Sequence, residues 1–387
     1  MPPAARSAPL AALAALAACV ALLAPAPAPA IDITLPPSGD NQFCSVTQGI
    51  GLVRATVEYH SPDVHAPDGH DRKGHIWGEL VPYGLTDLGY NGCTQCPWRG
   101  GANENTVFRI THDVKIEGQP LPAGEYGLHF IPGKDEWVVI FSKDAKAWGS
   151  YWYDPAKDQL RVTVKPEAGD YHEWLTYGFT DREPDGATLL LEWEALRVPI
   201  RISVDDWTGL YVANLRDEFR TRAAFEWKAF KDAADFCLAR KAHLDQGLLW
   251  AQEAVSRPGN GVANFQTLTT LAQLQIANGR AAEGAATFDR AMALPGVTPQ
   301  DVHGLARGLQ GMGNEAEAKR LYLANAKRFP NQWPVNFGLA RAAAIDGDFA
   351  KAAALARRSL PQAPDEPNRR NIESIAAGWE KQAAAKK

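Results

Sequence analysis

The feature that most limits how this chain can fold is a sequence repeat of 34 residues in its C-terminal part. A leucine–alanine pair recurs at that spacing, as Leu271-Ala272, Leu305-Ala306 and Leu339-Ala340. Two further series keep the same register, namely Gly279, Gly313 and Gly347, and Phe288, Tyr322 and Ala356. A repeat of this length with apolar residues at helical spacing predicts stacked pairs of helices. The alanines let paired helices approach closely, and the glycines close the turn between them.

A paired-helix period of this length is typical of tetratricopeptide repeats, so we assign residues 241–387 to a tetratricopeptide-like α-solenoid. We expect connecting helices at 205–240, a degenerate first unit with Trp250 and Ala254 facing inward, and a polar capping helix at 372–386. Such a solenoid either holds a protein or peptide segment on its concave face or supports the neighbouring domain. The first helix of each pair would supply the concave positions Gln266, Thr270, Gln273, Asp301, His303, Arg307, Asn336 and Arg341.

The N-terminal half has a different pattern. From residue 49 to 204, short runs that alternate apolar and polar residues are separated by turn signals such as Pro122-Ala123-Gly124. We predict strands at 52–59, 75–81, 107–110, 124–131, 136–141, 160–164, 174–179, 188–193 and 197–204. This spacing indicates an antiparallel β-sandwich or barrel over residues 45–204, preceded by a linker at 31–44. The predicted chain is therefore multidomain, β then α.

The first 30 residues have the pattern of an export signal. Arg6 gives a short positive region, residues 8–24 are apolar, and Ala28-Pro29-Ala30 offers a cleavage site. We therefore expect a periplasmic or secreted protein. Alternatively, Leu16-Ala17-Ala18-Cys19 fits a lipoprotein signal, which would anchor the chain through a lipid on Cys19. The net charge of −5, with no basic block, argues against a nucleic-acid partner.

Two of the cysteines form a C-x-x-C unit, Cys93-Thr94-Gln95-Cys96, which has neither a second pair of ligands nor a βαβ context. A zinc ribbon would need two more ligands, and a redox motif of the thioredoxin type would need a helix at the first cysteine. In an exported protein the pattern favours a structural disulfide. That disulfide is either local, between Cys93 and Cys96, or linked to Cys44, with metal binding and redox catalysis as the alternatives.

Several motifs of the β part occur in an order that resembles one known family. They include Tyr59-His60-Ser61-Pro62, Trp98 to Thr106, Leu121-Pro122-Ala123-Gly124, Trp148-Gly149 and Glu173-Trp174-Leu175. Over residues 45–203 the chain resembles the bacterial domain of unknown function 2911, an exported β domain that tetratricopeptide-like helices often follow. The resemblance implies this architecture and an envelope location, and it implies no activity. Residues 86–97 are an extra segment relative to shorter members, so the C-x-x-C lies outside what the family shares.

The stretch from Trp98 to Thr106 combines an aromatic ring, a guanidinium, two glycines and two amides. It either fixes a tight β corner or lines a polar ligand pocket. In a pocket, Arg99 and Asn103 would bind a carboxylate or sugar hydroxyls, and an aromatic face would stack on a glycan or small molecule. The candidate ligand-binding residues are Trp98, Arg99, Asn103, Lys143 and Glu173. In a structural corner, Arg99 would pair with Glu173 inside the fold.

Four histidines, His60, His65, His70 and His75, recur every five residues among aspartates. A five-residue step aligns side chains on neither a strand nor a helix, and the intervening prolines and glycines indicate a loop. The loop is either a solvated connection or a weak candidate site for a divalent metal such as Zn²⁺. Apart from this metal, the sequence calls for no cofactor.

The sequence contains no recognisable catalytic motif, since it lacks a G-x-S-x-G elbow, an H-E-x-x-H helix and a phosphate-binding glycine loop. We therefore assign no catalytic residue. The pattern favours a non-enzymatic binding or scaffolding protein of the bacterial envelope that uses its helical repeats for protein interaction. The alternative is a metal-dependent or glycan-processing enzyme with its site at the Trp98–Thr106 end of the β domain.

Overall fold

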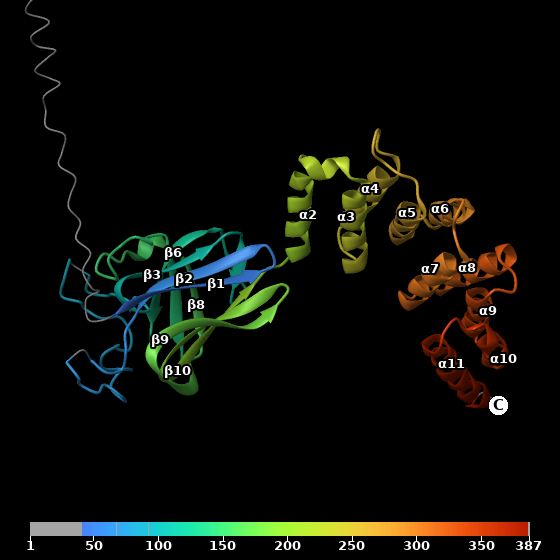
Figure 1. Cartoon of the computed structure of the whole chain (residues 1–387). Coiled ribbons are helices and arrows are strands. Elements are labelled where there is room, and N and C mark those ends of the chain that lie inside the picture. Colours follow the sequence, from blue (N-terminus) through green and yellow to red (C-terminus); the bar gives the residue numbers. More distant parts are fainter. Residues whose placement is uncertain (1–40, 67, 92, 386–387) are drawn as a thin grey trace, which may run out of the picture. The chain divides into compact units, whose positions relative to one another are not determined.

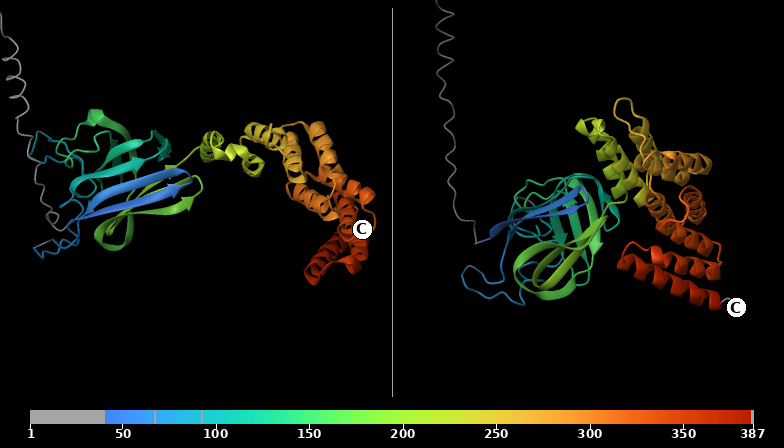
Figure 2. Two further views of the ribbon diagram at one scale, coloured as in Figure 1. Left: turned by 45° about the horizontal axis from the view of Figure 1, so that its top comes forward. Right: turned by 45° about the vertical axis from the view of Figure 1, so that its right-hand side comes forward.

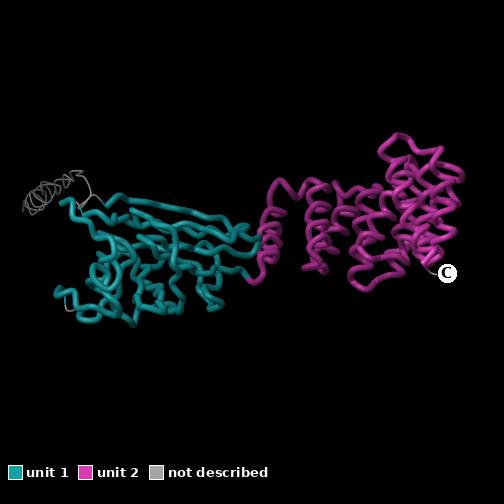
Figure 3. Tube along the Cα trace, turned by 90° about the horizontal axis from the view of Figure 1, so that it is seen from below, with its two compact units in different colours: residues 1–204 teal, residues 205–387 magenta. Residues whose placement is uncertain are grey.

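The computed structural model describes residues 41–385, apart from 67 and 92. The predicted export signal, Cys19 and residues 31–40 of the predicted linker lie outside the described residues. The chain divides into two compact units between Val204 and Asp205 (Figure 3). The described part of the first unit is built of β strands and the second of helices, which confirms the predicted fold class.

The β unit consists of two antiparallel sheets that face each other as a sandwich (Figure 1). One sheet has the strand order β1-β2-β3-β6-β7-β8, and the other has the order β5-β4-β10-β9. Along β2 the side chains of Val53, Ala55 and Val57 are buried while their neighbours are not, as expected for a strand with one face on a core. The strands are β1 Gln42–Ile50, β2 Val53–Ser61, β3 Ala102–Ile110, β4 Val114–Ile116, β5 Gln119–Leu121, β6 Gly124–Ile131, β7 Trp137–Ser142, β8 Asp158–Val164, β9 Glu167–Glu183 and β10 Gly186–Ser203.

Two of the sequence predictions for this unit need correction. Residues 42–44 belong to β1 rather than to a linker; this edge strand is largely exposed, so it lacks a clear apolar alternation. The stretch 75–81 is a turn and not a strand. Gly78 has a left-handed φ of 90°, and the Val81 N–H donates to the Ile76 carbonyl at 2.8 Å. The alternation there reflects burial of Ile76 and Val81 against the core, not sheet pairing.

The predicted strands 188–193 and 197–204 form one long strand, β10. The strand pairs with β9 on both sides of Glu194, where the register shifts. Glu194 has a φ of 55°, and its carboxylate accepts a hydrogen bond from the Gly74 N–H. A bulge of this kind bends a strand without ending it, and a charged residue inside an apolar run gave the false appearance of a turn.

A cluster of aromatic rings fills one end of the sandwich. Trp77 lies 5.7 Å from Trp98, 5.2 Å from Trp137 and 5.6 Å from Trp193, measured between ring centroids. Trp98 is stacked on Trp193 at 6.3 Å, and Phe130 lies 5.8 Å from Trp98. Edge-to-face and stacked pairs of this kind add to the burial of apolar area. We call Trp77, Trp98, Phe130, Trp137 and Trp193 the aromatic cluster.

The helical unit is a succession of antiparallel helix pairs (Figure 2). Within the described residues, no helix has the length and apolar character needed to cross a membrane. Trp250 and Ala254 are buried, as predicted for a degenerate first unit. The helices are α2 Trp207–Glu218, α3 Trp227–Arg240, α4 Leu244–Ser256, α5 Phe265–Ala277, α6 Ala281–Ala293, α7 Pro299–Gly311, α8 Glu315–Arg328, α9 Trp333–Ile345, α10 Phe349–Ser359 and α11 Glu366–Ala385.

The positions that repeat in the sequence have equivalent roles in the structure. Gly279, Gly313 and Gly347 end the first helix of each pair with φ values of 79°, 85° and 73°, a left-handed conformation that glycine adopts at little cost. The alanines of the three leucine–alanine pairs and the series Phe288, Tyr322 and Ala356 are fully buried. The three pairs α5–α6, α7–α8 and α9–α10 are therefore structural repeats.

The buried Phe288 ring provides a test of the repeat core. Phe288 is packed in one cluster with Val302 and Ala306, so Phe288→Ala should lower the free energy of unfolding of the helical unit by about 3–5 kcal/mol. Leu323 on α8 is exposed, and Leu323→Ala should change it by less than about 0.5 kcal/mol. Denaturant unfolding followed by far-ultraviolet circular dichroism measures both. Equal effects of the two substitutions would contradict the assigned packing.

Candidate functional site

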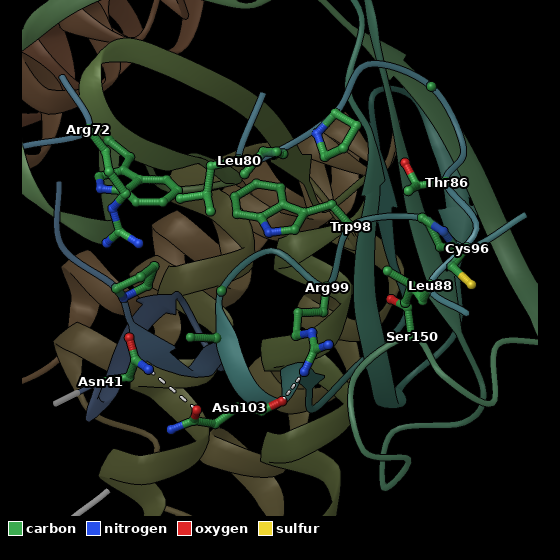
Figure 4. A pocket seen from close by; sticks show the side chains of 18 residues that line it. Asn41, Arg72, Leu80, Thr86, Leu88, Cys96, Trp98, Arg99, Asn103 and Ser150 are labelled. Atoms are coloured by element: carbon green, nitrogen blue, oxygen red, sulfur yellow. Dashed lines mark hydrogen bonds between the residues drawn. The ribbon is translucent and has the colours of Figure 1, made fainter. Parts of the chain in front are cut away.

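A cavity of about 540 Å³ lies in the β unit at the Trp98–Thr106 stretch (Figure 4). Such a volume can hold a small organic ligand. The described residues that line it include two arginines and no aspartate or glutamate. They are Asn41, Pro62, Arg72, Leu80, Val81, Pro82, Gly84, Thr86, Leu88, Cys96, Pro97, Trp98, Arg99, Gly101, Ala102, Asn103, Ser150 and Trp193.

The backbone beside the cavity is fixed at Gly100. Its φ is 66°, and an added Cβ would lie 2.6 Å from both the Phe130 ring and the Tyr177 hydroxyl, so no other residue fits there without displacement. The Gly100 carbonyl accepts hydrogen bonds from the Tyr177 hydroxyl at 2.8 Å and the Thr106 hydroxyl at 3.2 Å. The fixed backbone at Gly100 therefore also fixes the positions of the two residues before it. The Trp98 ring packs in the aromatic cluster, and Arg99 lines the cavity.

Arg99 is held on three sides. Its Nη1 donates to the Asn103 carbonyl, and its guanidinium carbon lies 5.0 Å from the centre of the Tyr151 ring. It also lies directly on Gly149, where a Cβ would overlap the guanidinium. None of the described residues forms an ion pair with Arg99. The Glu173 pairing considered from the sequence does not occur, and Asn103 holds Arg99 through its main chain rather than through its amide.

The structure brings together three of the five candidate ligand-binding residues. Trp98, Arg99 and Asn103 line the cavity, and the Asn103 side-chain oxygen accepts a hydrogen bond from Asn41 Nδ2 at 3.4 Å. Lys143 is exposed and outside the lining, beyond the end of β7. Glu173 also lies outside the lining. Both residues were selected because they belong to motifs of the resemblance, and neither motif reaches the cavity.

Glu173 instead joins β9 to the loop that follows β2. Its carboxylate accepts hydrogen bonds from the His65 N–H at 2.9 Å, from His65 Nδ1 at 2.7 Å and from the Tyr171 hydroxyl at 2.5 Å. Partial burial opposes ionisation, but these hydrogen bonds outweigh it and lower the pKa of Glu173 to about 2. The hydrogen bond to Glu173 also raises the pKa of His65. Glu173 is a structural contact in this fold.

The four histidines of the metal candidate do not converge. His60 Nδ1 lies 3.1 Å from Glu104, His65 contacts Glu173, and His75 Nδ1 lies 3.0 Å from Glu79. The His70 N–H donates to Asp68. Among the described residues, no three histidine, cysteine, aspartate or glutamate side chains are grouped so as to hold a metal ion. The metal-dependent alternative depended on convergence and has no support in this part of the chain.

The two cysteines of the C-x-x-C unit form a local disulfide, Cys93–Cys96. Cys44 is a free cysteine on β1, so the alternative linkage to Cys44 is not the one in the structure. The Thr86 and Cys96 backbones exchange two hydrogen bonds, at 3.0 and 2.9 Å, and both residues line the cavity. The disulfide therefore cross-links the loop that forms one wall of the cavity.

Arg72, Ser150 and the buried His129 are site residues that the sequence reasoning missed. Ser150 lines the cavity, and its Oγ lies 3.1 Å from His129 Nδ1. Burial, and then the charge of Arg99, lower the pKa of His129 to about 4, although Asp144 opposes this shift. The Trp148-Gly149 motif precedes Ser150 directly and could have indicated that position. Nothing in the sequence links it to Arg72 or His129.

A second polar surface lies on the helical unit. Two sets of neighbouring first helices contact each other, α3 with α5 and α7 with α9, as expected of helices on the inner side of a superhelix. Of the predicted concave residues, Thr270 and His303 are buried. The others are half-buried or exposed, namely Gln266, Gln273, Asp301, Arg307, Asn336 and Arg341.

On this surface Arg307 of α7 and Arg341 of α9 occupy equivalent positions of the repeat, and neither forms an ion pair with a described residue. Arg341 Nη1 donates to Gln310 Oε1 at 3.4 Å, and its guanidinium carbon lies 4.9 Å from the centre of the Phe337 ring. Its Nε is buried and has no hydrogen-bond partner among the described residues. Burial and the charge of Arg307 lower the pKa of Arg341. Burial and both arginines lower the pKa of His303 to about 4.

These observations define a protein with a β-sandwich and a tetratricopeptide-like solenoid. Residues 42–202 match the model of the family described as "Protein of unknown function (DUF2911)". The match covers nearly all of the described β unit, and the resemblance inferred from its motifs is confirmed. None of the curated proteins matches the chain.

Two of the solved structures similar to the chain illustrate the extent of the likeness. One is a tetratricopeptide repeat protein from Parabacteroides merdae, at 13% identity and a TM-score of 0.29 over 45% of this chain and 68% of that chain. Another is MamA from Desulfovibrio magneticus RS-1, at 12% identity and a TM-score of 0.25 over 41% of this chain and 96% of that chain. The assignment of the helical unit depends on its own helix pairs and repeat, not on these similarities.

His129 provides a pH-dependent test of the site. Its pKa is about 4 in the folded protein and about 6.5 when unfolded, so between these values the unfolded chain binds more protons. Its contribution to stability is fully present above the unfolded pKa and is lost as the pH falls through this range, by on the order of 3 kcal/mol. His129→Asn, in which the amide replaces Nδ1, should show a smaller loss in denaturant titrations of the β unit. Equal pH profiles for the two proteins would contradict the buried, neutral imidazole.

Proposed function

We propose that this protein is a non-enzymatic interaction scaffold of the bacterial envelope, and that its helical unit holds an acidic segment of a partner protein. The observation that supports this proposal is the pair Arg307 and Arg341 on α7 and α9, which form no ion pair with a described residue. The partner segment would lie across the first helices, in the manner of a peptide on the concave face of a solenoid.

The energetics of Arg341 favour a carboxylate at this position. A partly buried guanidinium that has lost water and gained no counter-charge is destabilising, and a carboxylate that approaches it replaces the lost interactions. The aromatic ring of Phe337 and the amide of Gln310 hold the guanidinium in place, so little side-chain freedom is lost on binding. Arg307 is exposed and adds a second positive charge at the equivalent position of the neighbouring repeat.

Peptide binding tests the acidic-segment proposal. A rhodamine-labelled peptide of alternating leucine and glutamate should bind the purified protein at low salt, and the same peptide with glutamine for glutamate should bind at least about tenfold more weakly. Arg307→Gln with Arg341→Gln should remove most of this difference, as measured by fluorescence anisotropy. The binding should also weaken with added salt, because exposed charges are screened.

A matched control is the double variant Arg290→Gln with Arg358→Gln, which removes the same charge from the second helices α6 and α10. This variant should keep the preference for the acidic peptide. If both double variants lose it equally, the binding depends on net charge alone and the proposed surface is wrong.

The envelope location is proposed from the N-terminal sequence. In a bacterial host, the mature protein should be recovered outside the cytoplasm with Ile31 as its first residue, because Ala28-Pro29-Ala30 is the expected cleavage site. Cell fractionation and mass spectrometry of the N-terminal peptide measure this. A lipid-modified Cys19 at the N-terminus would replace the soluble form by an anchored one, and an intact N-terminus in the cytoplasm would contradict export.

A further inference from the structure

The described lining of the cavity includes two arginines, and within this part of the chain one of them lacks a counter-charge. Arg72 Nη2 lies 3.3 Å from the Asp63 carboxylate and donates to the Asp63 carbonyl at 2.8 Å, while its Nε donates to the Val64 carbonyl at 3.1 Å. Arg72 is therefore neutralised within the fold. Arg99 has one hydrogen bond, to the Asn103 carbonyl, and no carboxylate contacts it among the described residues.

The charge of Arg99 acts on its surroundings. The buried His129 is hydrogen-bonded to Ser150 on the cavity wall, and the Arg99 charge is one of the causes that lower the His129 pKa. The Asp144 carboxylate opposes this effect on His129, but it is itself paired with Lys157 at 2.7 Å. Among the described lining residues the cavity therefore has one positive charge without a counter-charge, carried by a guanidinium that the Asn103 carbonyl, Gly149 and the Tyr151 ring hold in a fixed orientation.

The rest of the wall is mainly apolar. Leu80, Leu88, Pro97 and Trp98 line the cavity together with the edge of the aromatic cluster. The amide groups of Asn41 and Asn103 are hydrogen-bonded to each other, so they are less available to a ring of sugar hydroxyls. A site with one charge and apolar walls selects a singly charged ligand with an apolar body over a glycan or a doubly charged phosphate.

We propose that this cavity is a binding site for a monocarboxylate that carries an apolar ring or chain. The carboxylate would accept paired hydrogen bonds from Arg99, and the apolar part would lie against Leu80, Leu88 and Trp98. This site belongs to the β unit and does not depend on the acidic segment proposed for the helical unit. The two proposals can therefore fail independently.

Cinnamate and cinnamamide are suitable probes because they share one shape and differ in charge. Isothermal titration calorimetry on the purified protein should show cinnamate binding at one site per chain, and cinnamamide binding at least about tenfold more weakly. Arg99→Gln should reduce cinnamate binding to the level of cinnamamide. Arg54→Gln, which removes an exposed charge of β2 outside the cavity, should leave it unchanged.

A second pair of variants keeps the test valid if Arg99→Gln disturbs the fold. Leu80 lines the cavity and is 47% exposed, so a polar residue there should be tolerated. Leu80→Gln should weaken cinnamate binding only slightly, whereas Leu80→Glu places a negative charge beside the carboxylate and should weaken it at least about tenfold further. Cinnamamide should not distinguish the two variants.

The proposal is overturned if cinnamate does not bind, if cinnamate and cinnamamide bind equally, or if Leu80→Glu binds cinnamate as well as Leu80→Gln. The carboxylate can belong to a small acid or to the end of a peptide chain. The peptide alanyl-alanyl-phenylalanine, with a free carboxylate and as its amide, separates these sources. Preference for the free peptide over cinnamate assigns the site to chain ends, and the reverse assigns it to small acids; both results support carboxylate recognition.

Discussion

The β unit depends on the packing of four tryptophans and one phenylalanine that come from distant parts of the sequence. Trp77 belongs to a turn, Trp98 to the corner before β3, Trp137 to β7 and Trp193 to β10. Their mutual contacts bring a turn, a corner and both sheets together at one end of the sandwich. Because Trp98 is part of this cluster, the next residue along the chain, Arg99, is placed at the cavity by the core and not by a flexible loop. The packing of Trp98 in the core thus restricts the position of the Arg99 backbone.

Much of the fold follows from local patterns. The solenoid was predictable because the residues that repeat every 34 positions each suit one position of a helix pair. The glycines adopt positive φ at the turn between the helices, and the alanines of the leucine–alanine pairs and the series Phe288, Tyr322 and Ala356 are fully buried. The sandwich was predictable from alternation along strands such as β2. The sequence-based strand predictions were wrong where the alternation of apolar and polar residues does not coincide with strand pairing. The edge strand β1 pairs without burying a continuous face, and residues 75–81 bury side chains without pairing.

The candidate site was predictable only in part, because its geometry is tertiary. Sequence singled out Trp98, Arg99 and Asn103, which share one corner, and these three lie together. It grouped them with Lys143 and Glu173, which belong to other elements and have other contacts. Arg72 belongs to the loop after β2 and Ser150 to the segment after β7, and only the tertiary fold brings both residues to the cavity. The described lining residues include no aspartate or glutamate, and this is a property of the assembled wall that no local sequence pattern indicates.

The register of the helical repeat has a consequence for the direction in which a partner segment would lie on the solenoid. Gln273, Arg307 and Arg341 are spaced by 34 residues, so they are the same position in three successive repeats. That position is neutral on α5 and positive on α7 and α9. A surface built from identical repeats would bind an extended segment at nearly the same energy after a shift by one repeat or a reversal. Because Gln273 is neutral where the next two repeats have arginine, these alignments differ in energy. A segment with its negative charges near one end would find one alignment more stable than the others, so the solenoid would read the polarity of its partner as well as its charge.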